Sequence, residues 1–267
     1  MATAKVNGIQ ISYQVKGGGP PLLLISGLGQ NSSAWTPIVP MLRDRFSCIT
    51  FDNRGTGRNG APPGPYTIDQ MADDTAALIE HLKVGPVRAV GWSLGGSVLQ
   101  SMLIRHRDRL DRAVLLSAFP SYTELQHGWL DCLIALRRNA VDPLAIALFG
   151  MAWAFTPRWL SNHSAAVATA KLGLKDPYPT SGEGFEAQAH GLRSYDSRPD
   201  LPTVTTPTLV LVGAEDILTP VGQSAEIARL IPSARLQVLP RGGHGMVLEY
   251  TSDTVRAIIE FASSAPE

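Results

Sequence analysis

The pentapeptide Gly91-Trp92-Ser93-Leu94-Gly95, which fits the pattern G-x-S-x-G, is the most informative stretch of this chain. It follows the apolar run 87–90 and precedes a helix-like run from residue 94 to about residue 105. Strand, G-x-S-x-G and helix in this order predict a sharp turn with a nucleophilic serine at its tip. Glycine avoids a steric clash on either side of such a turn. The pattern alone is short enough to arise by chance, so Ser93 needs partners elsewhere.

Two residues far along the chain are suitable partners for Ser93. A serine hydroxyl is a weak nucleophile that needs a base and a third group to orient that base. His244 lies in the glycine-rich stretch 241–245, just after the strand-like run 235–239. Asp216 follows the buried strand-like run 208–213, and Glu215 is the rival acid. All of these positions lie at the carboxyl ends of predicted strands, where open α/β sheets bind their ligands.

With its chain order Ser93, Asp216, His244, the sequence resembles proteins of the α/β-hydrolase fold over nearly its whole length. The resemblance implies that Ser93 is the nucleophile, that His244 is general base and then general acid, and that Asp216 orients and stabilises the imidazolium. The segments 25–29, 51–57, 66–72 and 195–202 are similar to those of 3-oxoadipate enol-lactonases, and the first three also to those of the aminoacrylate hydrolase group.

The resemblance also implies an oxyanion hole built from backbone amides. The predicted strand 22–25 is followed by Ser26-Gly27-Leu28-Gly29, where the family usually has His-Gly. The amides of Leu28 and Leu94 correspond to the two donors of the family. Because the backbone supplies these donors, a serine at position 26 in place of the histidine does not remove them. The sequence leaves open only which side-chain contacts hold the loop in place. In the related segment 52–57, Arg54 is expected to brace neighbouring loops.

Composition places the chain among globular proteins without an affinity for nucleic acid. Of its 267 residues 44% are hydrophobic, and 23 Lys and Arg balance 23 Asp and Glu, with no basic patch. No signal peptide and no membrane-spanning run is recognised, so we expect a cytoplasmic protein. The two cysteines form no disulfide framework and no zinc spacing, and no metal or cofactor is expected. Assembly into a homo-oligomer is left open.

Strands and helices are predicted to alternate along most of the chain. A strand pair over 5–16 turns at Asn7-Gly8, and six further strands are expected near 21–25, 46–51, 87–91, 112–118, 207–213 and 234–239. Helices are expected near 67–83, 94–105, 220–231 and 247–263. This alternation predicts an α/β fold, with a mostly parallel, doubly wound sheet and helices on both faces. The predicted division is a core of 1–120 and 203–267 with a helical cap at 121–202.

The predicted cap is apolar and aromatic. Helix starts are expected at Asp142-Pro143 and Thr156-Pro157, and a capping box at 180–183. Trp129 and Trp153 are expected to line a substrate pocket, together with Trp92 of the pentapeptide, which could instead pack beneath the turn. One of five arginines in or next to the cap helices could bind a substrate carboxylate, and the sequence does not select among Arg137, Arg138, Arg158, Arg193 and Arg198.

Together these features predict a serine hydrolase that cleaves a small carboxylic ester or lactone through an acyl-enzyme intermediate. Its partner would be a small-molecule substrate. The alternatives are an amidase or C–C bond hydrolase of the same fold, or a ligand-sensing receptor on the hydrolase scaffold. Fold alone does not decide among them.

Overall fold

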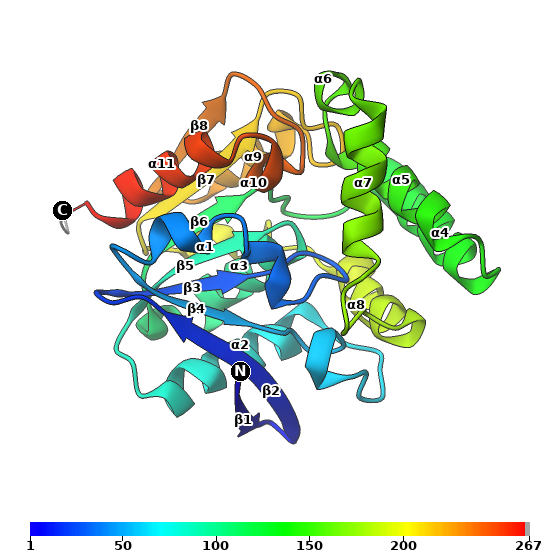
Figure 1. Ribbon diagram of the computed structural model, residues 1–267. Helices are drawn as coiled ribbons and strands as arrows, with labels where there is room; N and C mark the ends of the chain where they lie inside the picture. The colour runs from blue at the N-terminus through cyan, green and yellow to red at the C-terminus, as the bar shows by residue number, and fades with distance from the viewer. Residues whose placement is uncertain (265–267) are drawn as a thin grey trace.

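The computed structural model describes residues 1–264 and has an eight-stranded sheet at its centre (Figure 1). Its strands follow one another in the order β1-β2-β4-β3-β5-β6-β7-β8. β1 and β2 pair antiparallel, as do β2 and β4, and all other pairs are parallel, which confirms the mostly parallel sheet. The strands are β1 (Ala2–Val6), β2 (Ile9–Lys16), β3 (Pro21–Ile25), β4 (Ser47–Phe51), β5 (Val87–Trp92), β6 (Leu110–Leu116), β7 (Thr208–Gly213) and β8 (Ala234–Leu239).

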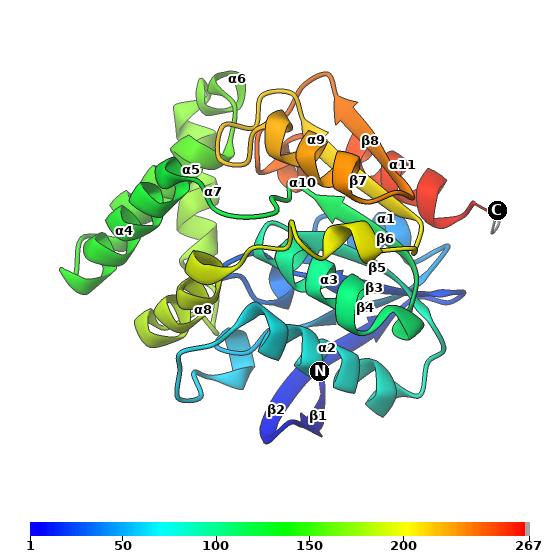
Figure 2. The same ribbon diagram turned by 180° about the vertical axis from the view of Figure 1, so that it is seen from behind.

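Helices cover both faces of this sheet. In Figure 1 the near face carries α1 (Val39–Leu42), α10 (Met246–Glu249) and α11 (Thr251–Ala262). In Figure 2 the opposite face carries α2 (Ile68–Leu82), α3 (Leu94–Arg105) and α9 (Val221–Leu230). Successive strand residues point to opposite faces, so Leu22 and Leu24 join one buried cluster and Leu23 joins the other. Burial on both faces explains the continuous apolar runs of the central strands.

The observed structure differs from the predicted one in its short helices and in one helix that is interrupted. The single helix expected at 247–263 is two helices, α10 and α11, which are separated at Tyr250. α1 and four 3-10 helices were not predicted, because one turn of helix shows no hydrophobic period. The 3-10 helices are η1 (Ser32–Trp35), η2 (Gly57–Asn59), η3 (Arg107–Arg109) and η4 (Leu201–Thr203).

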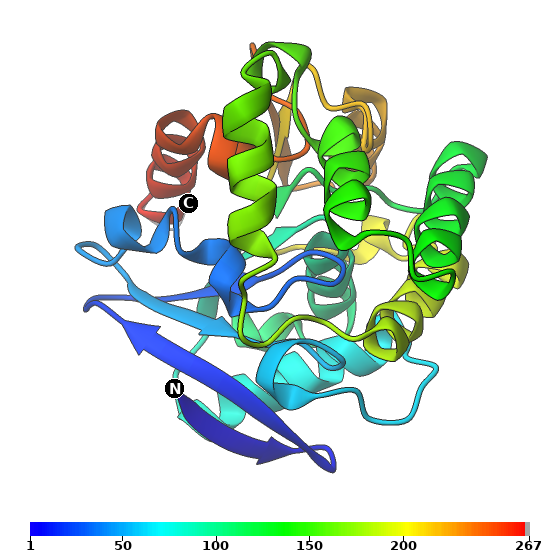
Figure 3. The same ribbon diagram turned by 45° about the vertical axis from the view of Figure 1, so that its right-hand side comes forward.

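Five helices between β6 and β7, here called the helical insertion, lie over the carboxyl ends of the parallel strands rather than on the faces of the sheet (Figures 1 and 3). Asp142 and Thr156 cap α5 and α6 as predicted. The capping box expected at Thr180 is wrong: Ser181 caps α8, so the third helical position is a glycine without a side chain. The helices are α4 (Glu124–Arg138), α5 (Pro143–Ala154), α6 (Pro157–Leu160), α7 (His163–Gly173) and α8 (Gly182–Ser194).

None of the helices in residues 1–264 is long and apolar enough to cross a membrane. The longest are α2 and α4, with 15 residues each. At 1.5 Å per residue such a helix measures about 22 Å, which is less than the hydrocarbon thickness of a bilayer.

The turn between β5 and α3 is as sharp as its glycines predict. Ser93 has a φ of 57° and a ψ of −118°, a conformation that costs a non-glycine residue roughly 1–3 kcal/mol. A Cβ atom on Gly91 would lie 2.2 Å from the carbonyl oxygen of Gly95. A Cβ atom on Gly95 would lie 2.1 Å from the carbonyl oxygen of Ile25 at the end of β3. Glycine therefore lets β3, β5 and α3 come together at Ser93.

We predict that Gly95→Ala destabilises the protein while a matched change elsewhere does not. The added methyl group would collide with the β3 backbone, which should lower the free energy of unfolding by about 1–3 kcal/mol or more. Gly128→Ala is the control, because a Cβ there meets no atom within 4 Å and alanine favours helix by about 0.5–1 kcal/mol. Urea denaturation measures both. Equal stability of Gly95→Ala and wild type would contradict the steric account.

Candidate active site

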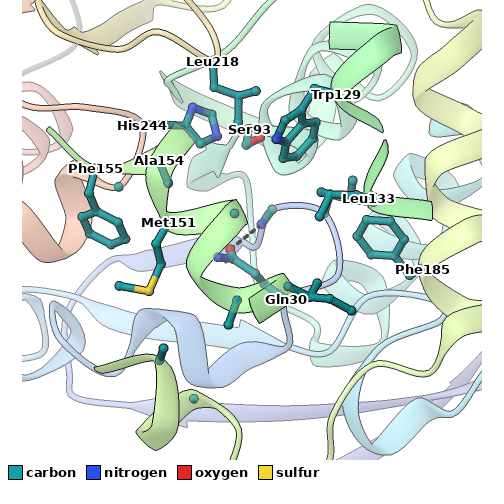
Figure 4. Close-up of a pocket in the computed structure, with 18 of the residues that line it drawn as sticks. Gln30, Ser93, Trp129, Leu133, Met151, Ala154, Phe155, Phe185, Leu218 and His244 are labelled. Carbon is teal, nitrogen blue, oxygen red and sulfur yellow. Dashed lines mark hydrogen bonds between the residues drawn. The ribbon is translucent and has the colours of Figure 1, made fainter. Parts of the chain in front are cut away.

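The structure brings Ser93, Asp216 and His244 together at the carboxyl ends of β5, β7 and β8. Ser93 and His244 line the same cavity (Figure 4). The Nδ1 atom of His244 lies 3.1 Å from Oδ2 of Asp216. The Asp216 side chain is fully buried and that of His244 is 7% exposed. A serine, an imidazole and a carboxylate thus meet although their positions in the chain are far apart.

Asp216 is held in an ionised state by its surroundings. Its Oδ1 accepts hydrogen bonds from the amides of Leu218 (3.0 Å) and Thr219 (2.8 Å). Burial by itself raises the pKa of the Asp216 carboxyl, but the charge of His244 and hydrogen bonds from His244 and Thr219 outweigh burial, so the net pKa is lowered. Glu215, the rival acid, is exposed and accepts from the amide of Gly242 instead.

Thr219 is a site residue that the sequence analysis missed. Its Oγ1 lies 3.0 Å from Nδ1 of His244, 2.8 Å from Oδ2 of Asp216 and 3.1 Å from the carbonyl oxygen of Ser117. A hydroxyl has one hydrogen, so Thr219 donates to one of these oxygens and can accept from the imidazole. The signal was present, since an aspartate followed by a turn often binds the amides two and three residues on.

The turn after β3 is braced by hydrogen bonds of Ser26 and Asn53. Oγ of Ser26 donates to the carbonyl oxygen of Asn31 at 3.2 Å. The side-chain amide of Asn53 donates to the carbonyl oxygen of Ser26 at 3.4 Å. Hydroxyl and amide bonds therefore hold the loop that the sequence left undecided.

A glutamine on the helical insertion ties this turn to the neighbouring loop. Oε1 of Gln188 accepts from the amide of Gly29 (2.9 Å), and its Nε2 donates to the carbonyl oxygen of Arg54 (2.8 Å). The guanidinium of Arg54 forms a buried bidentate pair with Asp74, with N···O distances of 2.7 and 2.8 Å. The Arg54 side chain thus ties its loop to α2 rather than to a neighbouring loop.

Two backbone amides near Ser93 have no partner. Leu28 lines the cavity, and the preceding Gly27 approaches Ser93 closely, since a Cβ built on it would lie 3.4 Å from Cβ of Ser93. Leu94 is the first residue of α3, so its amide has no acceptor within the helix. Within residues 1–264 neither amide donates a hydrogen bond to another group.

The cavity above Ser93 measures about 710 Å³, a size typical of small-molecule sites. The ends of the parallel strands form its floor and the helical insertion forms its walls. Most of the lining side chains are apolar, and those labelled in Figure 4 are Leu133, Met151, Ala154, Phe155, Phe185 and Leu218. In the described part of the chain, no three His, Cys, Asp or Glu side chains lie where they could hold a metal ion.

The three tryptophans expected at the pocket have different positions. Trp129 lines the cavity, and its Nε1 is buried without a hydrogen-bond partner in the described chain (Figure 4). Trp92 also lines it, but its Nε1 donates to the carbonyl oxygen of His244 at 3.0 Å and so holds the histidine loop. Trp153 is not among the described lining residues, because α5 turns Ala147, Met151 and Ala154 toward the cavity instead. The expectation for Trp153 is therefore corrected.

Comparison with known proteins finds likeness over almost the whole chain. Residues 20–250 match the model of the alpha/beta hydrolase fold family. The sequence is 28% identical to the provisionally named carbamate hydrolase RutD of Caulobacter sp. (strain K31), over 98% of both chains. It is 29% identical to 3-oxoadipate enol-lactonase 2 of Acinetobacter baylyi, over 82% of this chain and 80% of that protein. The enol-lactonase structure from Burkholderia xenovorans LB400 has a TM-score of 0.88 at 26% identity, covering 98% of this chain and all of that one.

Asp216 is predicted to make stability depend on pH in acid. Its pKa is lowered in the folded protein relative to the ordinary value of about 3.9 in the unfolded chain. The resulting stabilisation is present above that ordinary value and is lost as the pH falls through the folded-state pKa. Urea denaturation of wild type and Asp216→Asn from about pH 6 to pH 3 measures it. The difference between the two should shrink below about pH 4; a constant difference would rule out a lowered pKa.

Proposed function

Because the chain belongs to the alpha/beta hydrolase fold family, we propose that it is a serine hydrolase that cleaves small carboxylic esters or lactones through an acyl-enzyme intermediate. The observation that carries the proposal is that Ser93 and His244 line the floor of an apolar cavity, while the buried Asp216 lies against Nδ1 of His244. Hydrolases with similar sequences and folds support the class of reaction.

In the proposed mechanism the imidazole of His244 takes the proton of Ser93 Oγ while this oxygen attacks the substrate carbonyl carbon. The tetrahedral intermediate then collapses, the carbon–oxygen bond to the alcohol breaks, and His244 returns the proton to the leaving alcohol. A water molecule, activated by the same imidazole, releases the acid and restores the Ser93 hydroxyl. Asp216 stabilises the imidazolium that forms in each step. In the neutral state of His244, the same contact at Nδ1 fixes the tautomer of the imidazole.

The amides of Leu28 and Leu94 are proposed to form the oxyanion hole. Both lack partners in the described chain, and both belong to turns whose glycines bring them close to Ser93. Preorganised donors of this kind typically contribute about 3–4 kcal/mol each to stabilisation of the transition state. Since Gln188 also holds the amide of Gly29, the turn is fixed before substrate arrives.

The helical insertion is proposed to act as a cap, with 121–202 as the cap and 1–120 with 203–267 as the core. Its side chains supply the apolar walls of the cavity, which favours an uncharged ester or lactone group at Ser93. Trp129 contributes a buried N–H that could donate to a substrate oxygen. A cytoplasmic location and self-association stay predictions.

Cleavage of a carbon–nitrogen bond is a second candidate, supported by the likeness to a provisionally named carbamate hydrolase. The same serine, base and oxyanion donors serve amide and carbamate carbonyls, and the leaving nitrogen would take its proton from His244. The choice therefore depends on the substrate contacts of the cavity and not on the triad.

We predict that Ser93→Ala lowers turnover of a short-chain p-nitrophenyl ester by several orders of magnitude, because the attacking oxygen is lost. Circular dichroism should show an unchanged fold, since one hydroxyl is removed. A parallel panel of lactones, amides and carbamates identifies the preferred bond. Activity of Ser93→Ala near that of wild type would refute the mechanism, and tight ligand binding without turnover of any substrate would favour a receptor role.

Thr219→Val is predicted to lower kcat roughly tenfold with little change in KM, because His244 and Asp216 lose a hydroxyl that positions both. Valine has nearly the same shape, so packing is kept. Thr219→Ser is the matched control and should restore most of the activity. Steady-state kinetics of the three proteins decide the matter, and full activity of the valine variant would show that Asp216 alone suffices.

A further inference from the structure

One arginine lies in the wall of the active-site cavity. Arg137, near the end of α4, is among the lining residues and is half-buried. Its Nε atom is shielded from solvent and has no hydrogen-bond partner in the described chain. Arg137 is also the only Lys or Arg among the described residues that line this cavity, and none of them is Asp or Glu.

The other arginines of this region have different environments. Arg138 pairs with Glu186, Arg193 with Asp131 and Arg198 with Asp196, all near the surface. Arg158 is exposed to solvent. For Arg137 the structure gives no ion pair with any residue of 1–264. The cavity thus holds a permanent positive charge that the described chain does not neutralise.

Such a charge is costly unless something compensates it. Burial lowers the pKa of the Arg137 guanidinium, and no carboxylate acts in the opposite direction. The guanidinium lies over the ring of Phe185, 4.3 Å from its centroid, which offsets part of the cost through a cation–π contact. This contact uses none of the N–H donors, and no described residue accepts a hydrogen bond from the Arg137 guanidinium, so its donors are left for a bidentate acceptor such as a carboxylate.

The position of Arg137 relative to the reacting centre is fixed by α4. Trp129, Leu133 and Arg137 line the cavity at intervals of four residues, so they form one stripe of the helix. Eight residues of helix measure about 12 Å. The end with Trp129 is the one next to the Asp216–Thr219 loop, because Gln126 donates a hydrogen bond to the carbonyl oxygen of Leu218 at 2.9 Å. The stripe therefore presents a donor near the reacting carbonyl, an apolar section, and a cation at the far end.

We propose that Arg137 binds a carboxylate at the distal end of the substrate, so that the preferred ester or lactone is an elongated, singly charged acid ester rather than a neutral one. The inference rests on the proposed function of Ser93. It adds a substrate class: an apolar chain with a hydrolysable carbonyl at one end and a carboxylate at the other. The carboxylate would replace water around the guanidinium and form two charge-assisted hydrogen bonds.

The test compares esters that differ only in the distal charge. The first series is p-nitrophenyl monoesters of diacids from succinic to sebacic, each paired with the neutral monoacid ester of equal length. The second series carries the carboxylate on the alcohol side, as acetate esters of hydroxy acids with neutral counterparts. The enzymes are wild type, Arg137→Met, Arg137→Lys and the matched control Arg138→Met, whose arginine is exposed and paired with Glu186.

Wild type is expected to prefer the charged ester in one series, most strongly for the longer members. Arg137→Met should lower kcat/KM for those esters about 10- to 100-fold, mainly through KM, and lower kcat/KM for neutral esters far less. Arg137→Lys should recover part of the loss, and Arg138→Met should behave as wild type. The inference is overturned if neither series shows a charge preference that depends on Arg137, or if neutral and charged esters lose activity equally.

Failure of the inference can be told apart from failure of the proposed function. Hydrolysis of neutral esters that disappears in Ser93→Ala supports the serine mechanism whatever Arg137 does. A binding measurement needs no turnover: monomethyl suberate should raise the melting temperature of Ser93→Ala, but not that of the Ser93→Ala/Arg137→Met double variant, and methyl octanoate should not distinguish the two. An equal rise for both proteins with monomethyl suberate would count against Arg137.

Discussion

The contact between the backbones of Gly91, Gly95 and Ile25 is the constraint on which the site depends. These atoms approach so closely that no side chain fits between the end of β3, the end of β5 and the start of α3. The contact forces Ser93 into a left-handed conformation that the packed cores on both faces of the sheet hold in place. As a result, its hydroxyl and the turn carrying Leu28 face the same cavity.

A second layer of polar contacts holds the loops around that point. Arg54 and Asp74 neutralise each other away from water, and Gln188 links the Arg54 loop to the turn at Gly29. Breaking a buried pair of this kind leaves a charge without compensation, which makes the arrangement hard to shift. Because Gln188 belongs to α8, the same contacts fasten the helical insertion to the core. The loops that shape the site are thus fixed by the insertion as well as by the sheet.

The sequence predicted the parts of this arrangement that depend on local pattern. Ser93, Asp216 and His244 each follow an apolar run that ends in glycine or a turn, so their places at strand ends could be read directly. Thr219, Gln188 and the orientation of Arg137 depend on how distant segments pack, which no single window contains. For the same reason the sequence could not tell that Trp129 lines the cavity and Trp153 does not. Both are apolar residues of helices, and the rotation of each helix about its axis decides which of its side chains face the cavity.

Satisfied and unsatisfied polar groups have different roles around the cavity. Asp216, Arg54 and Asp74 form hydrogen bonds inside the protein, and they position other groups. The amides of Leu28 and Leu94, together with Trp129 Nε1 and Arg137 Nε, have no partner in the described chain. A buried donor without an acceptor costs free energy, so a ligand that offers acceptors at these points gains from each of them. The amides at the strand ends would then bind the reacting carbonyl of the substrate, while side chains of α4 bind the rest of the substrate.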